Sequence, residues 1–260
     1  QLSAAQPLLD YTPPADLLAD DVVLLTGASR GIGRAVSLAA AACGAQMVLM
    51  ARNVGQLEQL ADEIVATGGH EPGIIPVNLE GATADDYLDF AGLIAERYGR
   101  LNGLVLNAGT LGEMAPLATY DPVTWARVFQ LNVHSQFLLL QAMLPLMNRA
   151  GHGSIIFTSS GVGRQGRAYW GAYAATKFAN EGMMQVLADE LETNSPVRVN
   201  ALNPGRVRTE MRALAYPAED PTTLPHPAAV ANAYLYLLGS DSRDIHGQSL
   251  DAQAPRPPRV

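Results

Sequence analysis

The chain has 260 residues, of which 48% are hydrophobic and 16% are charged, so it is long enough to bury a large core without disulfides. The 17 basic and 25 acidic residues give a net charge of −8, which argues against a nucleic-acid-binding surface. A single cysteine excludes an internal disulfide and a cysteine-based metal site. We therefore expect a globular protein without a metal or a nucleic-acid partner.

No stretch reaches the roughly 18 unbroken apolar residues of a membrane span. The first 20 residues include acids and a proline pair but no basic start, which is not typical of a signal peptide. We expect a cytoplasmic protein with no membrane partner. Its arginine-rich, lysine-poor composition is typical of a GC-biased genome, and the one remaining lysine, Lys177, invites a chemical interpretation because lysine pKa values shift readily.

Apolar runs alternate with amphipathic segments along the chain. The predicted strands cover residues 22–26, 46–51, 73–78, 104–107, 154–159, 197–202 and 248–251. The predicted helices cover residues 32–43, 55–66, 83–98, 122–149, 172–192 and 227–238. Most strand runs are continuously apolar, which is typical of strands covered by helices on both faces. The pattern predicts an α/β fold, a single-domain Rossmann-like doubly wound parallel sheet of about seven strands.

No linker divides this pattern, so residues 20–252 are predicted to form one domain. Residues 1–19 would form an N-terminal arm and residues 253–260 a C-terminal tail. Within the domain, the proline-containing residues 206–226 predict a lid over the substrate. Pro145 lies inside the predicted helix 122–149 and should kink or end it.

A glycine-rich loop at residues 26–33, Thr-Gly-Ala-Ser-Arg-Gly-Ile-Gly, follows the first strand and opens the first helix. Glycines let the backbone approach a pyrophosphate, and a helix N-terminus offers free N–H groups to it. The spacing differs from G-x-G-x-x-G, but the strand before and helix after it predict a dinucleotide site. A glycine-rich turn without a ligand is the alternative.

Tyr173 and Lys177 are four residues apart, which places them on one face of a helix. A free tyrosine ionises near pH 10, so acid–base work near pH 7 requires a pKa lower by about three units, ~4 kcal/mol. A cation about 4 Å away at an effective dielectric near 20 contributes a similar amount. Lys177 can therefore activate Tyr173, and a solvated surface pair is the alternative.

Further polar residues follow the predicted strands. Ser159 and Ser160 end the fifth strand, at the edge where an open parallel sheet binds its ligands, although serine pairs are also common in turns. Residues 107–109, Asn-Ala-Gly, close the fourth strand at the same edge. Asn132 is a poor helix former inside the predicted helix 122–149, and it marks either a local distortion that exposes a carbonyl or a tolerated polar residue.

Together these residues resemble the short-chain dehydrogenase/reductase family, of the conventional single-domain type. The resemblance covers roughly residues 20–252 and includes the loop at 26–33, residues 107–109, and Pro204, Gly205 and Thr209. Within the family, residues 157–190 are most similar to bacterial oxidoreductases of the YciK type. The resemblance implies an enzyme that uses a nicotinamide cofactor and pairs into a homodimer or homotetramer through the helices predicted at 122–149 and 172–192.

The resemblance also implies a role for each matching residue. Tyr173 would be the general acid and base, Lys177 would bind the nicotinamide ribose and lower the pKa of Tyr173, and Ser160 would hold the substrate oxygen. Asn132 would support a water in a proton relay. Besides Tyr173 and Lys177, the cofactor would contact Gly27, Ser29, Arg30, Gly31, Ile32, Gly33, Asn78, Leu79, Asn107, Ala108, Gly109, Pro204, Gly205 and Thr209. Asn78 replaces the family's aspartate, and its amide oxygen can still accept a bond from adenine.

The end of the second strand indicates which cofactor is used. An acid there would bind the ribose 2′-hydroxyl of NAD, but this chain has Arg52. Arg30 in the glycine-rich loop can converge on the same point, and two arginines favour a 2′-phosphate. We predict a preference for NADP (NADPH), with NAD possible. The alternative is that Arg52 is a surface residue and Arg30 only a loop residue.

We therefore predict an NADP(H)-preferring oxidoreductase that transfers a hydride between nicotinamide and a small-molecule carbonyl or alcohol. The alternative from another class is a non-catalytic dinucleotide-binding sensor on the same fold. An isomerase or dehydratase with the same Tyr–Lys pair usually needs a longer chain with a substrate domain. Arg164 and Arg167 lie between Ser160 and Tyr173, and they either bind an acidic group of the substrate or are surface residues.

Overall fold

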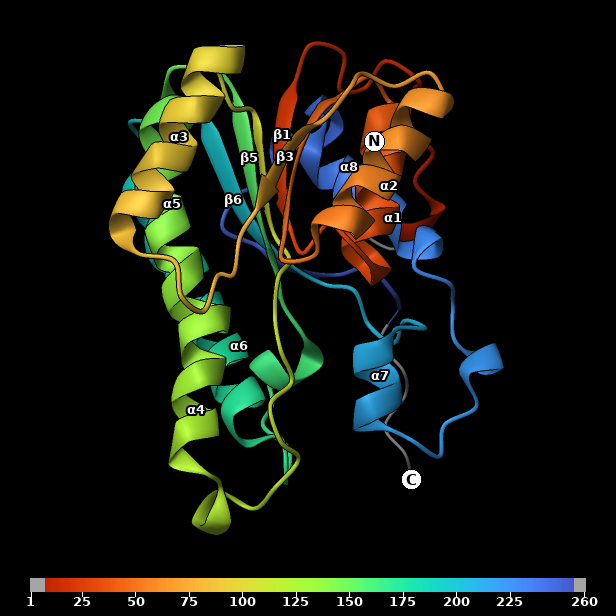
Figure 1. The fold of residues 1–260 in the computed structure, drawn as a ribbon, viewed down its shortest axis with the longest axis vertical. Coiled ribbons are helices and arrows are strands. Elements are labelled where there is room, and N and C mark those ends of the chain that lie inside the picture. The colour runs from red at the N-terminus through yellow and green to blue at the C-terminus, as the bar shows by residue number, and fades with distance from the viewer. Residues whose placement is uncertain (1–7, 255–260) are drawn as a thin grey trace.

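The computed structural model describes residues 8–254 and contains one seven-stranded, all-parallel sheet in the order β3-β2-β1-β4-β5-β6-β7 (Figure 1). The strands are β1 (Val22–Thr26), β2 (Gln46–Ala51), β3 (Gly73–Pro76), β4 (Gly103–Leu106), β5 (Gly153–Thr158), β6 (Val197–Asn203) and β7 (Ser249–Asp251). The chain moves outward from β1 to β3 and then returns to β4 beside β1. Open α/β sheets bind ligands at such a reversal in strand order. The all-parallel, seven-stranded sheet confirms the predicted fold class.

Helices cover both faces of the sheet (Figure 1). They are α1 (Gly31–Ala42), α2 (Val54–Ala66), α3 (Ala84–Tyr98), α4 (Pro122–Phe129), α5 (Ser135–Asn148), α6 (Gly171–Leu191), α7 (Glu210–Ala215) and α8 (Ala228–Leu238). One hydrophobic core lies between the sheet and α1, α2 and α8, and a second lies between the sheet and α3, α5 and α6. Because both faces of the central strands are covered, most strands are largely apolar, as the sequence pattern predicted. None of the helices within residues 8–254 is long and apolar enough to cross a membrane.

The helix predicted at residues 122–149 is interrupted in its middle. α4 runs into a single π-helical turn at Gln130–His134, and α5 continues from Ser135. Pro145 lies inside α5 and does not end it at once, because the helix reaches Asn148. The carbonyl that loses its partner to Pro145 belongs to Gln141, four residues earlier, and Gln141 is exposed to water.

The segment before β1 packs against the body of the molecule from Leu8 onward. Leu8, Tyr11 and Leu18 are buried in the core beside α8, and the ring of Tyr11 contacts that of Tyr236 with a centroid distance of 5.1 Å. At the other end Ala252 is buried as well. The remainder of the predicted arm and tail, residues 1–7 and 255–260, lies outside the described residues.

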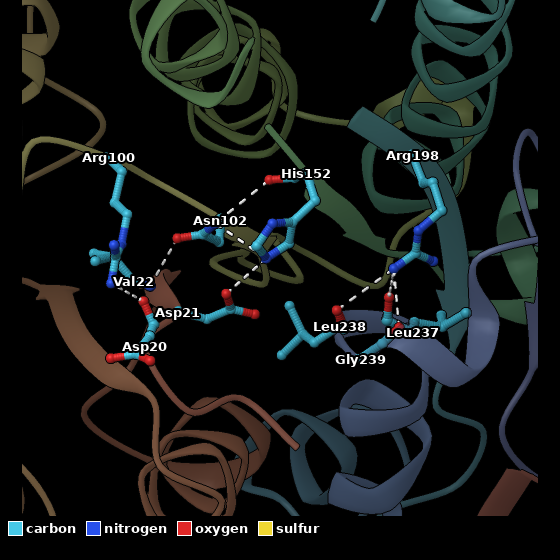
Figure 2. Close-up of polar contacts among 10 residues, drawn as sticks. All are labelled: Asp20, Asp21, Val22, Arg100, Asn102, His152, Arg198, Leu237, Leu238 and Gly239. Carbon is cyan, nitrogen blue, oxygen red and sulfur yellow. Dashed lines mark hydrogen bonds and ion pairs between the residues drawn. The ribbon is translucent and has the colours of Figure 1, made fainter. Parts of the chain in front are cut away.

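Polar side chains join the elements at the amino ends of the strands (Figure 2). Asn102 accepts a hydrogen bond from the Val22 backbone N–H (3.1 Å). His152 lies 2.7 Å from Asp21. The guanidinium of Arg198 donates to the carbonyls of residues 237, 238 and 239, at the C-terminal end of α8. These bonds hold the edge of the sheet opposite the ligand-binding edge.

Candidate active site

The carboxyl ends of the central strands open into a pocket of about 680 Å³. The predicted site residues that line it are Gly27, Ser29, Arg30, Gly31, Ile32, Arg52, Leu79, Asn107, Ala108, Gly109, Ser160, Tyr173, Lys177, Pro204, Gly205 and Thr209. The pocket runs from the end of β2, past the glycine-rich loop, to the start of α6. The fold therefore brings residues spread over most of the chain into one continuous site.

Three predicted residues do not line this pocket. Gly33 lies beneath the glycine-rich loop, where an added Cβ would be 2.2 Å from the Gly27 carbonyl oxygen. Asn78 is exposed, and its side chain accepts a hydrogen bond from the Glu80 backbone N–H (3.3 Å) within the turn that follows β3. Asn132 is fully buried. Gly33 thus allows the loop to pack closely, and Asn78 shapes a turn beside the pocket.

The glycine-rich loop leaves the N-terminus of α1 open to the pocket. Gly27 and Gly31 have positive φ angles of 69° and 56°, which other residues rarely adopt. The side-chain amide of Asn107 donates to the Thr26 carbonyl (3.1 Å) and holds the loop against β4. Arg30, at the N-cap position, makes no side-chain cap. The first N–H groups of α1 are therefore available to a pyrophosphate, so the loop fits a dinucleotide.

The two predicted phosphate-binding arginines lie along the same pocket. Arg52 follows β2 and is exposed. Arg30 forms an ion pair with Glu210 of α7, and both side chains are largely exposed. Exposed pairs of this kind contribute little to stability, so Arg30 can exchange Glu210 for an anionic ligand. The structure thus places Arg30 beside α7, at the end of the pocket formed by the glycine-rich loop.

Tyr173 and Lys177 lie on the inner face of α6, one helical turn apart, and both are buried. The Lys177 amine is 5.6 Å from the centre of the Tyr173 ring and donates to the Thr158 carbonyl (2.6 Å) at the end of β5. Ser160 follows that strand and lines the pocket with them. The three groups predicted to act on a substrate are thus assembled at one end of the pocket.

Burial shifts the pKa values of both groups on α6. Loss of solvent raises the pKa of Tyr173 to about 12, and the neighbouring Ser160 hydroxyl offsets this only in part. Loss of solvent also lowers the pKa of Lys177 to about 8, against the opposing effect of the Glu181 carboxylate. In the cofactor-free protein, burial therefore outweighs the expected lowering of the Tyr173 pKa by Lys177. Tyr173 keeps its proton at neutral pH.

Asn132 lies in the π-helical turn and connects two parts of the site. Its side-chain oxygen accepts from the Thr110 backbone N–H (2.8 Å), and its amide donates to the Thr110 carbonyl (2.9 Å) and the Thr176 hydroxyl (3.1 Å). Of the two interpretations of Asn132 in the sequence, the local distortion is confirmed. Asn132 holds the loop after β4 next to the residue that precedes Lys177.

A buried carboxylate that the sequence interpretation missed lies behind Lys177. Glu181 follows Lys177 by one helical turn and is only 6% exposed. It accepts a hydrogen bond from Ser159 and lies 3.4 Å from the guanidinium of Arg164, which also bonds Asp251 (2.9 Å). The i, i+4 spacing from Lys177 is the signal that could have identified Glu181.

These contacts also settle the position of Arg164. Its guanidinium is directed to Glu181, to Asp251 and to the Leu250 carbonyl (2.8 Å), away from the pocket. Arg167 is exposed, and neither arginine is among the described residues that line the pocket. The structure therefore supports the interpretation of Arg164 and Arg167 as surface and structural residues, and not as ligands of an acidic group of the substrate.

The loop after β6 is held by the end of the described chain. The Gln253 amide donates to the carbonyls of Pro204 (2.8 Å) and Arg206 (2.9 Å). Thr209 caps α7 by accepting a hydrogen bond from the Arg212 N–H (3.1 Å). The segment 206–226, predicted as a lid, contains α7 and contributes to the lining of the pocket.

Apolar residues that the sequence interpretation did not single out complete the end of the pocket beside Tyr173. They are Leu111, Trp170, Met211 and Ala215. Trp170 immediately precedes α6, and Met211 and Ala215 are four residues apart in α7. Each of the first three lies within three residues of a motif residue, but an apolar side chain in such a place is equally typical of core packing, so the sequence alone did not assign them to the pocket.

Within residues 8–254, no group of three or more His, Cys, Asp or Glu side chains could hold a metal. A Rossmann-type sheet, an open helix N-terminus and a buried Tyr–Lys pair instead define an oxidoreductase built around a dinucleotide site. Comparison with known proteins identifies the family. Residues 21–220 match the family model described as short chain dehydrogenase, and the chain belongs to the short-chain dehydrogenase/reductase family.

Individual relatives agree with this membership. The chain is 47% identical over 252 residues to a protein described as the uncharacterized oxidoreductase YciK of Escherichia coli K12, covering 97% of this chain and 99% of that protein. A short chain dehydrogenase structure from Pseudomonas syringae has a TM-score of 0.92 and 48% identity over 94% of this chain and 99% of its own. Another, from Escherichia coli CFT073 in complex with NADPH, has a TM-score of 0.90 and 49% identity over 93% of this chain and 100% of its own. The predicted resemblance to YciK-type enzymes is confirmed.

Proposed function

We propose that the protein is an NADP(H)-dependent oxidoreductase that interconverts a carbonyl compound and the corresponding alcohol. One observation carries this proposal. Ser160, Tyr173 and Lys177 meet at one end of the same pocket whose other end is formed by the glycine-rich loop and Arg52. A dinucleotide bound along the pocket would lie beside a proton donor.

The residues present fit such a cofactor. The open N-terminus of α1 would take the pyrophosphate, and residues 107–109 and 204–209 would line the path to the nicotinamide end. Arg52, with Arg30 released from Glu210, supports a preference for the 2′-phosphate of NADP(H). The similar structure from Escherichia coli CFT073 binds NADPH, which also supports this choice. When bound, the cofactor supplies or accepts the hydride.

The chain's own residues would control the proton. Because burial raises the pKa of Tyr173 to about 12, its hydroxyl carries a proton at neutral pH and can donate it to a carbonyl oxygen. Ser160 would hold the same oxygen, and the positive Lys177 would stabilise the tyrosinate that remains. This arrangement supports catalysis in the direction of reduction.

Asn132 would act as a positioning residue in this mechanism. Its side chain is occupied by Thr110 and Thr176, so its effect on Lys177 would come through the placement of α6 and of the loop after β4. The π-helical turn leaves irregular backbone next to the site, which is where a proton-relay water would bind. A non-catalytic sensor on the same fold is not favoured, because it would have no need of Ser160 beside a buried Tyr–Lys pair.

Equilibrium binding and turnover of the Tyr173→Phe variant test the proposal together. The purified protein is titrated with NADPH and with NADH while nicotinamide fluorescence is followed, and carbonyl-dependent NADPH oxidation is then measured. We expect tighter binding of NADPH, weakened by Arg52→Ala. Tyr173→Phe should retain NADPH affinity within about twofold and lose turnover by at least 10²-fold, the lower range for removal of a general acid.

The outcomes separate the parts of the proposal. Tighter binding of NADH would overturn the cofactor preference and leave the oxidoreductase assignment intact. Unchanged turnover in Tyr173→Phe would remove Tyr173 from the mechanism. Failure of the folded protein to bind either nucleotide would overturn the proposed function as a whole.

A further inference from the structure

The end of the pocket beside Tyr173 is built from apolar side chains. Leu111, Val162 and Ala174 are buried there around Tyr173. Trp170, Met211 and Ala215 pack against this cluster from the start of α6 and from α7. A group next to the proposed proton donor is therefore removed from water by hydrocarbon and indole surfaces.

Two aromatic side chains, Trp170 and Tyr173, line this end of the pocket. The Trp170 ring lies 5.7 Å from the Tyr173 ring and 5.9 Å from the Tyr216 ring, measured between centroids, and both pairs are tilted. Such spacing is typical of packed aromatic pairs. Trp170 also lines the pocket, where its indole can pack against a further ring. Met211 adds a flexible thioether that adapts to flat apolar groups. These shapes favour a ring over a short alkyl chain.

The charges near this apolar end are already engaged. The Arg212 guanidinium binds Glu219 through two bonds (2.5 and 2.8 Å) and lies 3.7 Å from the centre of the Tyr216 ring. Arg164 is directed toward Glu181 and Asp251. A carboxylate on the substrate would thus meet apolar surface or a guanidinium that already has a carboxylate partner, and its desolvation would be uncompensated.

A third cation, Arg208, lies near the start of the segment 206–226 and also lines the pocket. It is exposed, donates to the Leu224 carbonyl (3.3 Å) and lies near Asp220, whose pKa is lowered chiefly by hydrogen bonds from Thr222 and to a smaller extent by Arg208. Arg30 and Arg52 lie toward the cofactor side. Among the arginines that line the described pocket, each therefore either has a protein partner or lies toward the proposed cofactor.

We propose that the substrate is an uncharged carbonyl compound that carries an apolar ring, and that Trp170 and Met211 determine this specificity. The inference rests on the proposed function and deepens it. In the reaction, the carbonyl carbon accepts a hydride from NADPH and the oxygen accepts the Tyr173 proton. A ketone then becomes a secondary alcohol as NADPH becomes NADP⁺, and solvent returns a proton to Tyr173.

A matched pair of ketones tests the class of substrate. Acetophenone and 4-acetylbenzoate share a ring and a methyl ketone and differ in one carboxylate, and acetone lacks the ring. We expect kcat/KM for acetophenone to exceed that for each of the others by at least tenfold, with NADPH in excess. An equal or higher value for 4-acetylbenzoate or for acetone would overturn the inference.

The NADPH titration keeps this test separate from that of the proposed function. If NADPH does not bind, the proposed function fails and the substrate inference fails with it. If NADPH binds and the protein reduces 4-acetylbenzoate or acetone but not acetophenone, in a reaction that requires Tyr173, only the substrate inference is overturned. If NADPH binds and acetophenone is not reduced, the substrate inference is overturned as well.

Variants at two adjacent aromatic residues test the role of Trp170. Trp170→Ala should raise KM for acetophenone at least tenfold and lower kcat/KM for acetone by a much smaller factor, with NADPH affinity unchanged. Trp170→Phe should keep most of the affinity for acetophenone, which guards against a folding defect in the alanine variant. Tyr169→Ala is the control, because Tyr169 is 58% exposed and does not line the pocket. Equal effects at 169 and 170, or equal losses with both ketones, would contradict the assignment.

Discussion

At the scale of single residues, the Tyr173–Lys177 pair shows what spacing can and cannot predict. The i, i+4 separation placed both groups correctly on one face of α6. The pKa values depend on burial, which no spacing rule contains, and burial moves the two groups toward their neutral forms. Glu181 was missed although its i, i+4 spacing from Lys177 was visible in the sequence, whereas the packing of Trp170 against α7 exists only after folding.

Lys177 provides a prediction about stability and pH. Its pKa is about 8 in the folded protein, against 10.5 in its unperturbed state, so the unfolded chain binds the proton more tightly. The cost of burying the charge is about 3 kcal/mol; it is fully present below pH 8 and disappears as pH rises toward 10.5. Lys177→Met removes this cost and should raise the free energy of unfolding at pH 7 by up to about 3 kcal/mol. The same variant should abolish turnover, because it lacks the positive charge proposed to stabilise the tyrosinate.

Denaturant unfolding of the cofactor-free protein at pH 7, 9 and 10 checks this expectation. The gain of the Met variant over the original chain should shrink steadily across this range. Arg127→Met serves as the control, because the Arg127 side chain is 63% exposed and its pairing with Glu80 is a surface contact. If Lys177→Met raised the free energy of unfolding equally at pH 7 and pH 10, or lowered it at pH 7, the effect would not come from burial of the Lys177 charge.

At the scale of elements, the strands and most helices were predictable because their apolar runs and amphipathic periods reflect the two covered faces. The π-helical turn was only partly predictable from the sequence. Asn132 marked an irregularity, but the choice between a distortion and a tolerated residue depends on Thr110 and Thr176, which approach it from other elements. The capping role of Arg198 likewise depends on α8, far away in sequence.

Arg198 gives the prediction at this scale. It satisfies the last carbonyls of α8 and also donates to the Ser242 carbonyl (2.8 Å). Arg198→Leu would remove these charge-assisted hydrogen bonds, although Ser154 and Ser242 still donate to the Leu237 carbonyl, and should lower the free energy of unfolding by about 2–3 kcal/mol. The melting temperature should fall by roughly 4–12 °C. Because Arg198 lies at the edge opposite the pocket, NADPH affinity and kcat/KM should stay within twofold.

A neighbouring arginine supplies the control for this variant. Arg243 is exposed and donates to the Ser240 carbonyl (3.2 Å), so Arg243→Leu should shift the melting temperature by less than 2 °C, as expected for an exposed surface site. Thermal melts of the three proteins, followed by circular dichroism, make the comparison. Equal melting temperatures for the two variants would show that Arg198 does not stabilise the end of α8.

At the scale of the whole molecule, the sheet and the position of its ligand-binding edge followed from the alternation of strands and helices. The association of chains did not. Val128 and Leu131, which lie in the helix predicted at 122–149, are buried within the chain itself. Phe137 on α5 and Phe178 and Val186 on α6 remain about half exposed or more, on helices that cover the same face of the sheet.

These exposed apolar residues support pairing of chains through α5 and α6, as the family resemblance implies. We expect size-exclusion chromatography with light scattering to show at least a dimer, and Phe137→Glu or Phe178→Glu to shift it toward the monomer. Leu93→Glu on α3, at 57% exposure, introduces the same charge on another helix and should leave the assembly unchanged. A monomeric original chain, or an equal effect of Leu93→Glu, would contradict this interface.

The lone lysine has a practical consequence. Because the sixteen other basic residues are arginines, the molecule carries a single side-chain amine, and that amine faces the pocket. With a pKa of about 8, it is partly unprotonated just above neutrality and open to acylating or aldehyde reagents small enough to enter. Apart from the α-amino group, covalent labelling of amines therefore reports occupancy of the active site alone. Cross-linkers and resins that capture surface lysines have no lysine on the outside of the fold to react with.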